Sequence, residues 1–202
     1  MQTQLFIDGE FVGSRAASTI PVLCPADGST LAEVAEGRGE DIDRAVAAAT
    51  RAAPRWAATP AAERGRLLLK LADAVETAAD ELARLEATDT GHPLRDTRLL
   101  DVPRTAATYR YFGGLADKYQ GSVIPVEPGF LNYVQRGPLG VVGSIVPWNF
   151  PLMFTSWKLG PALAAAVKPR FLSLAIGVTG SSGIMEPWRG TAGRCAARSS
   201  CG

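Results

Sequence analysis

Asn149 is the one amide side chain in a segment that is otherwise apolar and rigid. Residues 147–151 read Pro-Trp-Asn-Phe-Pro, so a proline restricts the backbone on either side of the asparagine. The side-chain amide donates and accepts hydrogen bonds without carrying a charge. Asparagine often satisfies the backbone of a turn, and this interpretation stands beside a second one, in which the amide acts on a bound ligand.

Two elements must position this turn. Residues 141–146 are rich in β-branched side chains and predict a buried strand that ends at Pro147. A buried helix is predicted to follow Pro151. The order of strand, tight turn and helix is typical of α/β domains that bind a ligand at the carboxyl ends of their strands. The apolar residues that suit this helix are Leu152, Phe154, Trp157, Leu159 and Leu163.

Length, composition and charge exclude several classes of protein. The chain has 202 residues, 47% of them hydrophobic and 20% charged, which suits one to one and a half globular domains. A net charge of +1 and the lack of a basic run with interleaved aromatic residues argue against nucleic-acid binding. Residues 137–157 carry no charge, but three prolines interrupt them, so they predict a core strand and turn and not a membrane span.

The cysteines and the histidine show no constellation for catalysis or metal binding. Cys24, Cys195 and Cys201 lack metal-ligand spacing, so we expect no metal site. Their odd number and the absence of a signal-peptide pattern favour a reducing, cytoplasmic setting. His92, the only histidine, follows Gly91 at a predicted helix end and is interpreted as a cap-region residue and not a base.

The first 118 residues predict strands followed by helices. Residues 5–12 read as a hairpin that turns at Asp8 and Gly9. Short strands are expected at 19–22 and 31–34. A first helix runs from Glu40 until Pro54 ends it. Four arginines without obvious partners are interpreted as solvated: Arg44, Arg64, Arg66 and Arg104.

Two further helical regions are expected before residue 119. A long helix with one apolar stripe, which includes Leu82 and Leu85, is expected to start at a cap on Thr59 and to stop at Gly91. A third helical region covers 96–118, and Pro103 either kinks it or begins its second half.

Residues 122–136 predict a β-hairpin that turns at Pro128 and Gly129. Exposed strand pairs often form a subunit contact by adding to a sheet edge. A surface hairpin of a monomer fits these residues equally well.

Residues 139–158 strongly resemble the aldehyde dehydrogenase superfamily, because the Pro-Trp-Asn-Phe-Pro turn and both of its flanks agree with that family. The resemblance covers residues from about 5 to 166. Four further stretches are similar to the family: 6–12, 32–37, 63–68 and 109–118.

The resemblance implies a fold and an activity. The expected class is α/β: a partial aldehyde-dehydrogenase-like fold with an incomplete Rossmann-like NAD(P)-binding domain, a helical region and a hairpin for oligomerisation. The implied reaction is oxidation of an aldehyde to a carboxylic acid through a cysteine thiohemiacetal. The implied division is 1–121 for strands and helices of the cofactor domain, 122–137 for the oligomerisation hairpin, 138–169 for the start of the Rossmann-like core and 170–202 for a divergent, poorly ordered tail.

The resemblance also assigns roles to individual residues. The amide of Asn149 would donate to the oxyanion that forms when a thiolate adds to the aldehyde. Lys168 would hold the adenosine ribose of NAD or NADP, but the glutamate expected beside it is absent until Glu186, so a solvated lysine is an equal alternative. The residues that would line the cofactor cleft are Ile145, Val146, Pro147 and Trp148.

No residue matches the nucleophilic cysteine or the general-base glutamate of the family. Residues 179–182 read Thr-Gly-Ser-Ser, either a pyrophosphate-binding turn or a small loop, and 188–202 show no periodicity. We therefore expect a truncated or frameshifted, inactive fragment of an aldehyde dehydrogenase that is a homo-oligomer at full length. The alternative is a non-catalytic module that pairs with intact family subunits through residues 122–136.

Overall fold

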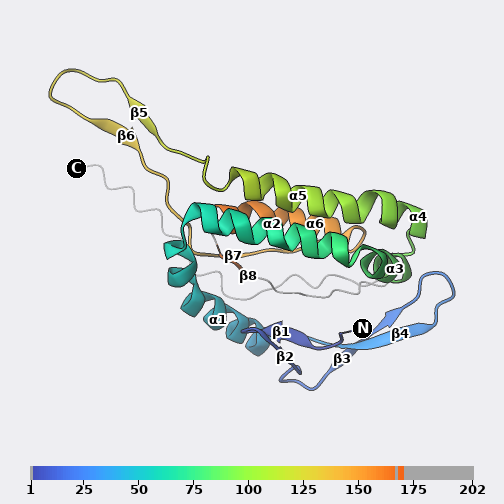
Figure 1. Ribbon diagram of the computed structural model, residues 1–202. Coiled ribbons are helices and arrows are strands. Elements are labelled where there is room, and N and C mark those ends of the chain that lie inside the picture. The colour runs from blue at the N-terminus through green and yellow to red at the C-terminus, as the bar shows by residue number, and fades with distance from the viewer. Residues whose placement is uncertain (1, 167, 171–202) are drawn as a thin grey trace.

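The structure, a computed structural model, describes residues 2–166 and 168–170 and shows a helical layer with short strands beside and beyond it (Figure 1). Helices α2, α5 and α6 lie side by side, and the amino-terminal strands form a separate layer reached through α1. In the part of the chain that is described, no helix has both the length and the apolar character to cross a membrane. Residues 179–182, Cys195, Cys201 and the predicted tail beyond Arg170 lie outside the described residues.

The amino-terminal strands form two antiparallel pairs. Strands β1 (Leu5–Ile7) and β2 (Glu10–Val12) confirm the predicted hairpin. Asp8 and Gly9 both have positive φ, 58° and 87°, the backbone that a tight two-residue hairpin turn requires. Strands β3 (Thr19–Leu23) and β4 (Thr30–Ala35) confirm the next two predictions.

Helix α1 (Gly39–Ala58) begins where buried Asp41 accepts hydrogen bonds from the backbone N–H groups of Arg15 and Arg38. Burial alone would raise the pKa of Asp41, but these donors and the Ser14 hydroxyl lower it below its ordinary value. The prediction that Pro54 ends this helix is wrong, because the helix continues through it to Ala58. Proline removes one backbone hydrogen bond there, and the four residues beyond it remain helical.

The predicted long helix is two helices, α2 (Ala61–Thr77) and α3 (Ala79–Thr90), separated at Ala78. The predicted cap on Thr59 is wrong, because its hydroxyl donates to the Arg55 carbonyl of α1 and the residue that precedes α2 is Pro60. Gly91 ends α3 at a φ of 78°, as predicted, because only glycine adopts this left-handed backbone freely.

The third helical region contains α4 (Leu94–Asp96), a π-helical turn η1 (Thr97–Asp101) and α5 (Val102–Leu115). Pro103 lies in the first turn of α5, so of the two predicted roles it begins the second half of the region. Helix α5 follows η1 without a break, because the Val102 N–H donates to the Thr97 carbonyl, so Pro103 lies just after the π-helical turn.

The core lies between α2, α3, α5 and the end of α6. Its largest contacts join α2 to α5, where Gly65 and Gly113 bring the two backbones together: a Cβ on Gly65 would lie 2.6 Å from the Gly113 carbonyl oxygen. Burial raises the pKa of the Tyr109 hydroxyl to about 12. The buried members of the core are Leu68, Ala72, Val75, Ala83, Val102, Ala106, Tyr109, Ala116 and Ala164.

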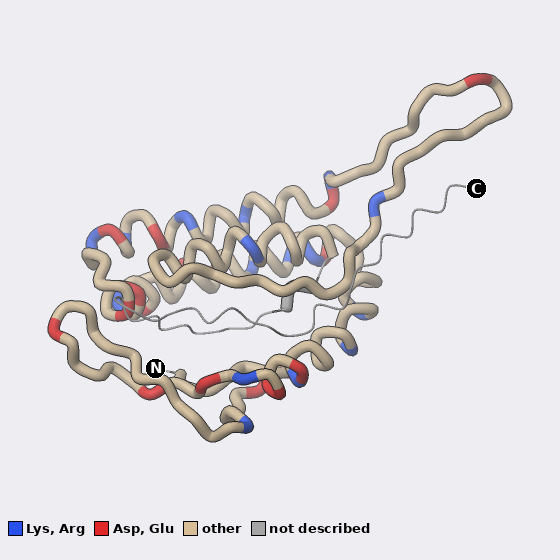
Figure 2. The backbone as a smooth tube through the Cα atoms, turned by 180° about the vertical axis from the view of Figure 1, so that it is seen from behind, with Lys and Arg blue, Asp and Glu red and all other residues tan. Residues whose placement is uncertain are grey.

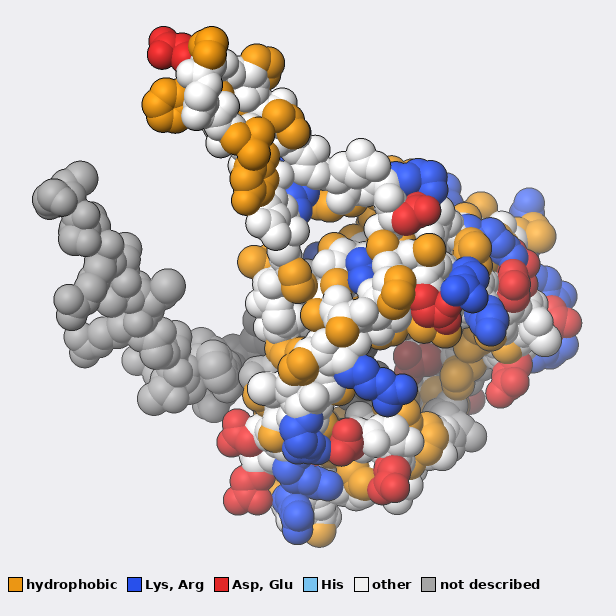
Figure 3. Space-filling model, turned by 60° about the vertical axis from the view of Figure 1, so that its left-hand side comes forward, with side chains coloured by type: hydrophobic (Ala, Val, Ile, Leu, Met, Phe, Trp, Pro, Cys, Tyr) orange, Lys and Arg blue, Asp and Glu red, His pale blue; other side chains and the backbone are white. Residues whose placement is uncertain are grey.

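Strands β5 (Ser122–Ile124) and β6 (Asn132–Val134) confirm the predicted hairpin. It projects from the helical body as an arm, and its tube carries far fewer charges than the helices do (Figures 1 and 2). In the space-filling view, hydrophobic side chains cover much of the arm (Figure 3).

The last described elements are β7 (Val141–Gly143), α6 (Pro151–Ala164) and β8 (Lys168–Arg170). The two strands are parallel, which confirms the α/β class. The predicted strand 141–146 is wrong in its end, because β7 stops at Gly143 and residues 144–147 have no regular structure.

Candidate functional site

The candidate site is the turn between β7 and α6. Residues 144–147 leave the carboxyl end of β7 without regular structure, and 148–150 turn the chain into α6. Phe150 is the residue before the helix and Pro151 is its first residue, as predicted. The Phe150 side chain does not cap α6, and Pro151 has no N–H group. The first free backbone donors of the helix are therefore the N–H groups of Leu152 and Met153.

The predicted site residues form an exposed surface at this turn. Ile145 is 86% exposed and Trp148 is 56% exposed. Pro147 and Asn149 are exposed, and Val146 is half-buried. Among the described residues, no hydrogen bond holds the Asn149 side-chain amide, so the turn itself does not use the amide. Donation by this amide to a ligand stays a prediction.

Lys168 lies in β8, the strand that pairs with β7. It pairs with Val141 in the parallel register of β8 and β7, so the predicted ribose ligand and the strand that leads to Asn149 are neighbours in one sheet. Helix α6 connects the two strands.

The carboxyl end of α6 is tied down by side chains from α1 and α2. The Arg64 Nε donates to the Ala164 carbonyl over 3.1 Å, and the Trp56 indole donates to the Leu163 carbonyl over 3.3 Å. Arg64 also donates to the carbonyl of Thr59, and its burial lowers the pKa of its guanidinium. The prediction that Arg64 is a solvated residue without a partner is wrong, because the last carbonyls of a helix need donors.

Two of the other arginines also have partners. Arg44 pairs with Asp41, and Arg66 pairs with Glu63 one turn away on the same helix. The prediction that they have no partners is therefore wrong for both. Arg66 is exposed, as predicted, whereas Arg44 is half-buried beside the buried Asp41.

An aromatic contact holds the other side of the turn. The Phe150 ring lies edge-on to the His92 ring, with centroids 4.5 Å apart. The His92 Nδ1 lies 3.3 Å from an Asp101 carboxylate oxygen. His92 therefore lies at the helix end, as predicted, and in addition connects the turn to η1.

A carboxyl group that the sequence analysis missed lies beneath the turn. Glu86 is only 5% exposed, and neither of its carboxylate oxygens makes a hydrogen bond within the described residues. Burial raises the pKa of Glu86 to about 7, and the Asp101 carboxylate adds to the rise. The Leu152 backbone N–H and His92 act in the opposite direction. Helix α3 therefore places a buried carboxyl group, that of Glu86, near the start of α6.

A signal for Glu86 was present in the sequence. Ala79, Leu82, Ala83 and Glu86 recur at helical spacing from the start of α3, so Glu86 belongs to the inner face. The predicted stripe included Leu85, which is 42% exposed, because it followed apolar residues and passed over the acidic residue next to it.

The parallel strand–helix–strand unit and the turn beyond β7 have the architecture of α/β domains that bind a dinucleotide at the carboxyl ends of strands. The aldehyde dehydrogenase family model matches residues 11–168. The chain belongs to the aldehyde dehydrogenase family.

Relatives with established names are similar over most of this chain. The mitochondrial aldehyde dehydrogenase family 2 member B4 of Arabidopsis thaliana is 46% identical over 164 residues, 80% of this chain and 30% of that protein. The mitochondrial aldehyde dehydrogenase of Homo sapiens is 43% identical over 164 residues, 80% of this chain and 32% of that protein. The chain thus spans about a third of the length of the curated relatives it matches.

Solved structures agree with the fold. PnpE in complex with nicotinamide adenine dinucleotide is 65% identical, with a TM-score of 0.82 over 84% of this chain and 35% of that chain. The NAD+ complex of an aldehyde dehydrogenase from Bacillus cereus is 43% identical, with a TM-score of 0.81 over the same shares. The predicted partial aldehyde-dehydrogenase-like fold is confirmed.

Proposed function

We propose that this chain is the amino-terminal portion of an NAD(P)-dependent aldehyde dehydrogenase, which oxidises an aldehyde to a carboxylic acid. Family membership supports the reaction class, and the NAD complexes of PnpE and of the Bacillus cereus enzyme support the cofactor. The observation that carries the proposal is the Asn149 amide, which is exposed past the carboxyl end of β7 and not used by the turn.

The role proposed for Asn149 follows from the charge that develops on the substrate. Addition of a thiolate to an aldehyde places negative charge on the carbonyl oxygen. A neutral amide stabilises that charge without adding a charge of its own, and loss of one such donor costs about 10²–10³ in rate. The prolines at 147 and 151 keep the amide in place before the charge forms.

The proposed cofactor surface consists of the residues that approach Asn149, with Lys168 as the proposed ribose ligand. Ile145 and Trp148 expose apolar side chains on a turn that leads into a helix, and such a surface suits a flat nicotinamide or adenine ring. NAD or NADP, when bound, accepts the hydride in this family. The residues of this chain would bind it and keep water from its face.

Tryptophan fluorescence tests the cofactor surface. Trp148 is exposed in the turn, and Trp157 is similarly exposed two turns along α6. We expect NAD to quench the emission of the wild-type chain and of Trp157→Phe, and to leave the emission of Trp148→Phe almost unchanged. Equal quenching of both variants, or no binding of NAD by calorimetry, would overturn this assignment.

We further propose that the 202-residue chain does not oxidise aldehydes by itself, because no residue matches the family's cysteine nucleophile and general base. Purified chain is incubated with NAD or NADP and a panel of aldehydes while the absorbance of the reduced cofactor is followed. No turnover is expected, and turnover above a cofactor-free control would contradict the proposal.

The exposed apolar residues of the β5–β6 hairpin favour a second function for this chain. In this function the chain pairs with other family subunits, and the full-length protein is a homo-oligomer. Val123, Phe130 and Leu131 are each more than 70% exposed on this projecting arm. Apolar surface of this extent on an arm is typical of an interface. Sedimentation tests it: the wild type should self-associate, Leu131→Lys should not, and Leu99→Lys, on η1, should behave as the wild type. A monomeric wild type would contradict this role.

A further inference from the structure

We propose that Glu86 caps the amino-terminal end of α6 from a neighbouring helix and, together with His92, positions the turn that carries Asn149. This inference rests on the proposed function, since it concerns the residue that the proposal places at the reacting oxygen. Glu86 and His92 are positioning residues here, because neither is placed in contact with substrate.

The start of α6 needs an acceptor that its own sequence does not provide. Phe150 offers no side-chain oxygen at the cap position, and no acidic residue lies in the first turn. Pro151 removes one of the free N–H groups, and Leu152 carries the next. A helix amino terminus with free donors is stabilised by a nearby carboxylate, through hydrogen bonding and through the helix dipole.

Glu86 is the carboxylate that meets this need. It comes from α3, is almost fully buried, and has no other hydrogen-bond partner among the described residues. The Leu152 N–H acts on its carboxyl group, although the present geometry lies outside hydrogen-bond limits. In the proposal, a small approach of the turn would complete this bond. A buried carboxyl without a partner is costly, so the pairing that satisfies Glu86 also fixes Leu152.

His92 acts on Phe150, the residue that follows Asn149. Its ring contacts Phe150 on one side and its Nδ1 approaches Asp101 on the other. Phe150 is the neighbour of Asn149 in the turn. A change at His92 therefore moves the backbone that carries the amide, while a change at Glu86 moves the helix that follows it.

The charge of Glu86 controls the strength of the cap. Three titratable groups face it: Asp101 from η1, Asp89 from α3 and His92 from the loop after α3. From α6 it meets only the backbone N–H of Leu152. An ionised carboxylate accepts this N–H more strongly than a neutral carboxyl does. The turn is therefore expected to respond to pH near neutrality, where the Glu86 pKa of about 7 lies.

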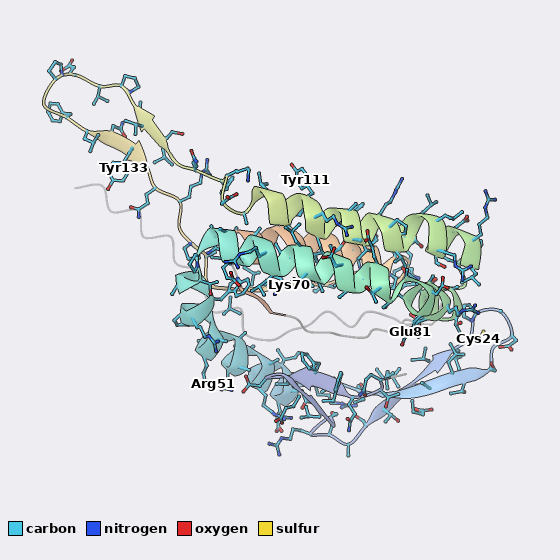
Figure 4. The ribbon with its side chains drawn as sticks, viewed as in Figure 1. Cys24, Arg51, Lys70, Glu81, Tyr111 and Tyr133 are labelled. Carbon is cyan, nitrogen blue, oxygen red and sulfur yellow. The ribbon has the colours of Figure 1, made fainter. Side chains whose placement is uncertain are left out.

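The test uses the intact 202-residue chain and nuclear magnetic resonance. The backbone amide of Leu152 and the side-chain amide of Asn149 are followed from about pH 5 to about pH 9. We expect both signals to shift with a common midpoint near 7 in the wild type. Glu86→Gln should abolish this titration, and Glu81→Gln, an exposed carboxylate on the same helix (Figure 4), should retain it.

His92→Gln provides a second, independent readout. Because His92 lowers the pKa of Glu86, its removal should move the midpoint of the Leu152 titration upward and shift the Asn149 side-chain signal. If Glu86→Gln does not fold, the wild-type titration and this displacement still decide the outcome. Absent titration in the wild type, titration that persists in Glu86→Gln, or a midpoint that His92→Gln leaves unchanged would overturn the inference.

Failure of the inference and failure of the proposed function give different results. The fluorescence experiment with NAD reports the cofactor surface at Trp148 and does not depend on Glu86. A lost cofactor response with an intact pH titration contradicts the function alone. The reverse pattern contradicts the role of Glu86 alone.

Discussion

Glu86 makes the stability of the folded chain depend on pH. Its pKa is raised in the folded state from the ordinary 4.5 to about 7, so between these values the folded chain holds a proton that the unfolded chain has released. The free energy of unfolding should therefore be highest near pH 4.5 and fall as pH rises through 7. The expected fall is on the order of 3 kcal/mol, because each pKa unit corresponds to about 1.4 kcal/mol.

Urea unfolding at a series of pH values measures this effect. Glu86→Gln should show no such fall, because an amide does not ionise, and should exceed the wild type in stability above pH 7. Glu81→Gln should follow the wild type at every pH. A Glu86→Gln variant with the pH dependence of the wild type would show that another group causes the fall.

Arg64 is the second residue whose role is decided by burial and partners. Arg64→Met keeps most of the side-chain volume and removes the donors to the carbonyls of Ala164 and Thr59. We expect a loss of about 1–3 kcal/mol in the free energy of unfolding, because half-buried carbonyls lose charged donors. Arg66→Met loses only an exposed ion pair on one helix and should cost less than about 0.5 kcal/mol. Equal effects in urea unfolding would contradict the role of Arg64.

At the scale of elements, α6 is held through small residues on its inner face. Its buried residues are Met153, Ser156, Gly160 and Ala164. The predicted packing residues of this helix were large ones, and Trp157 is in fact 46% exposed. Small side chains allow α6 to lie close to α5, so the large residues Leu152, Leu159 and Leu163 border the core and do not fill its centre.

Gly160→Ala tests this close approach. A Cβ at Gly160 would lie 2.7 Å from a ring carbon of Phe112 on α5, so the Phe112 ring or one of the two helices has to shift. We expect the substitution to lower the free energy of unfolding by about 1–3 kcal/mol, as overpacking does in cores. Gly114→Ala on α5 meets no atom within 4 Å and should raise stability by up to about 1 kcal/mol. Thermal unfolding of both variants measures the difference, and a stabilised Gly160→Ala would refute the packing.

The elements predicted well from the sequence are those fixed by local chemistry. The turn at Asp8 and Gly9, the stop at Gly91 and the helix start at Pro151 each depend on backbone preferences of one or two residues. The elements predicted poorly depend on partners elsewhere in the chain. Helix α1 continues through Pro54 to Ala58, and β7 ends at Gly143, three residues before the predicted end.

In the candidate site, too, the features fixed by neighbouring residues were predicted, and those that depend on distant residues were missed. The position of Asn149 past a strand follows from its flanking prolines, and the sequence predicted it. Glu86 and Arg64 were missed because their roles arise from α6, which lies more than 60 residues further along the chain. Charge and spacing alone cannot distinguish a buried acid or a half-buried arginine from a solvated one when the partners are backbone groups.

At the scale of the whole molecule, two parts differ in how they are stabilised. The helical body encloses its own apolar residues, whereas the arm made of β5 and β6 has only two strands and no covered face (Figures 1 and 3). An isolated hairpin is marginally stable in water, so the arm gains stability from an external surface. The proposed pairing with a second copy would provide such a surface.

Limited proteolysis at several protein concentrations tests this dependence. Chymotrypsin should cleave first beside Phe130 and Leu131, which are each 76% exposed in the arm, and more slowly in the helical body. If the arm pairs with another copy, cleavage there should slow as the chain concentration rises, while cleavage beside the exposed Tyr111 on α5 (Figure 4) should not. In Leu131→Lys the cleavage rate in the arm should not depend on concentration. Rates that are independent of concentration in the wild type would show that the arm remains unpaired.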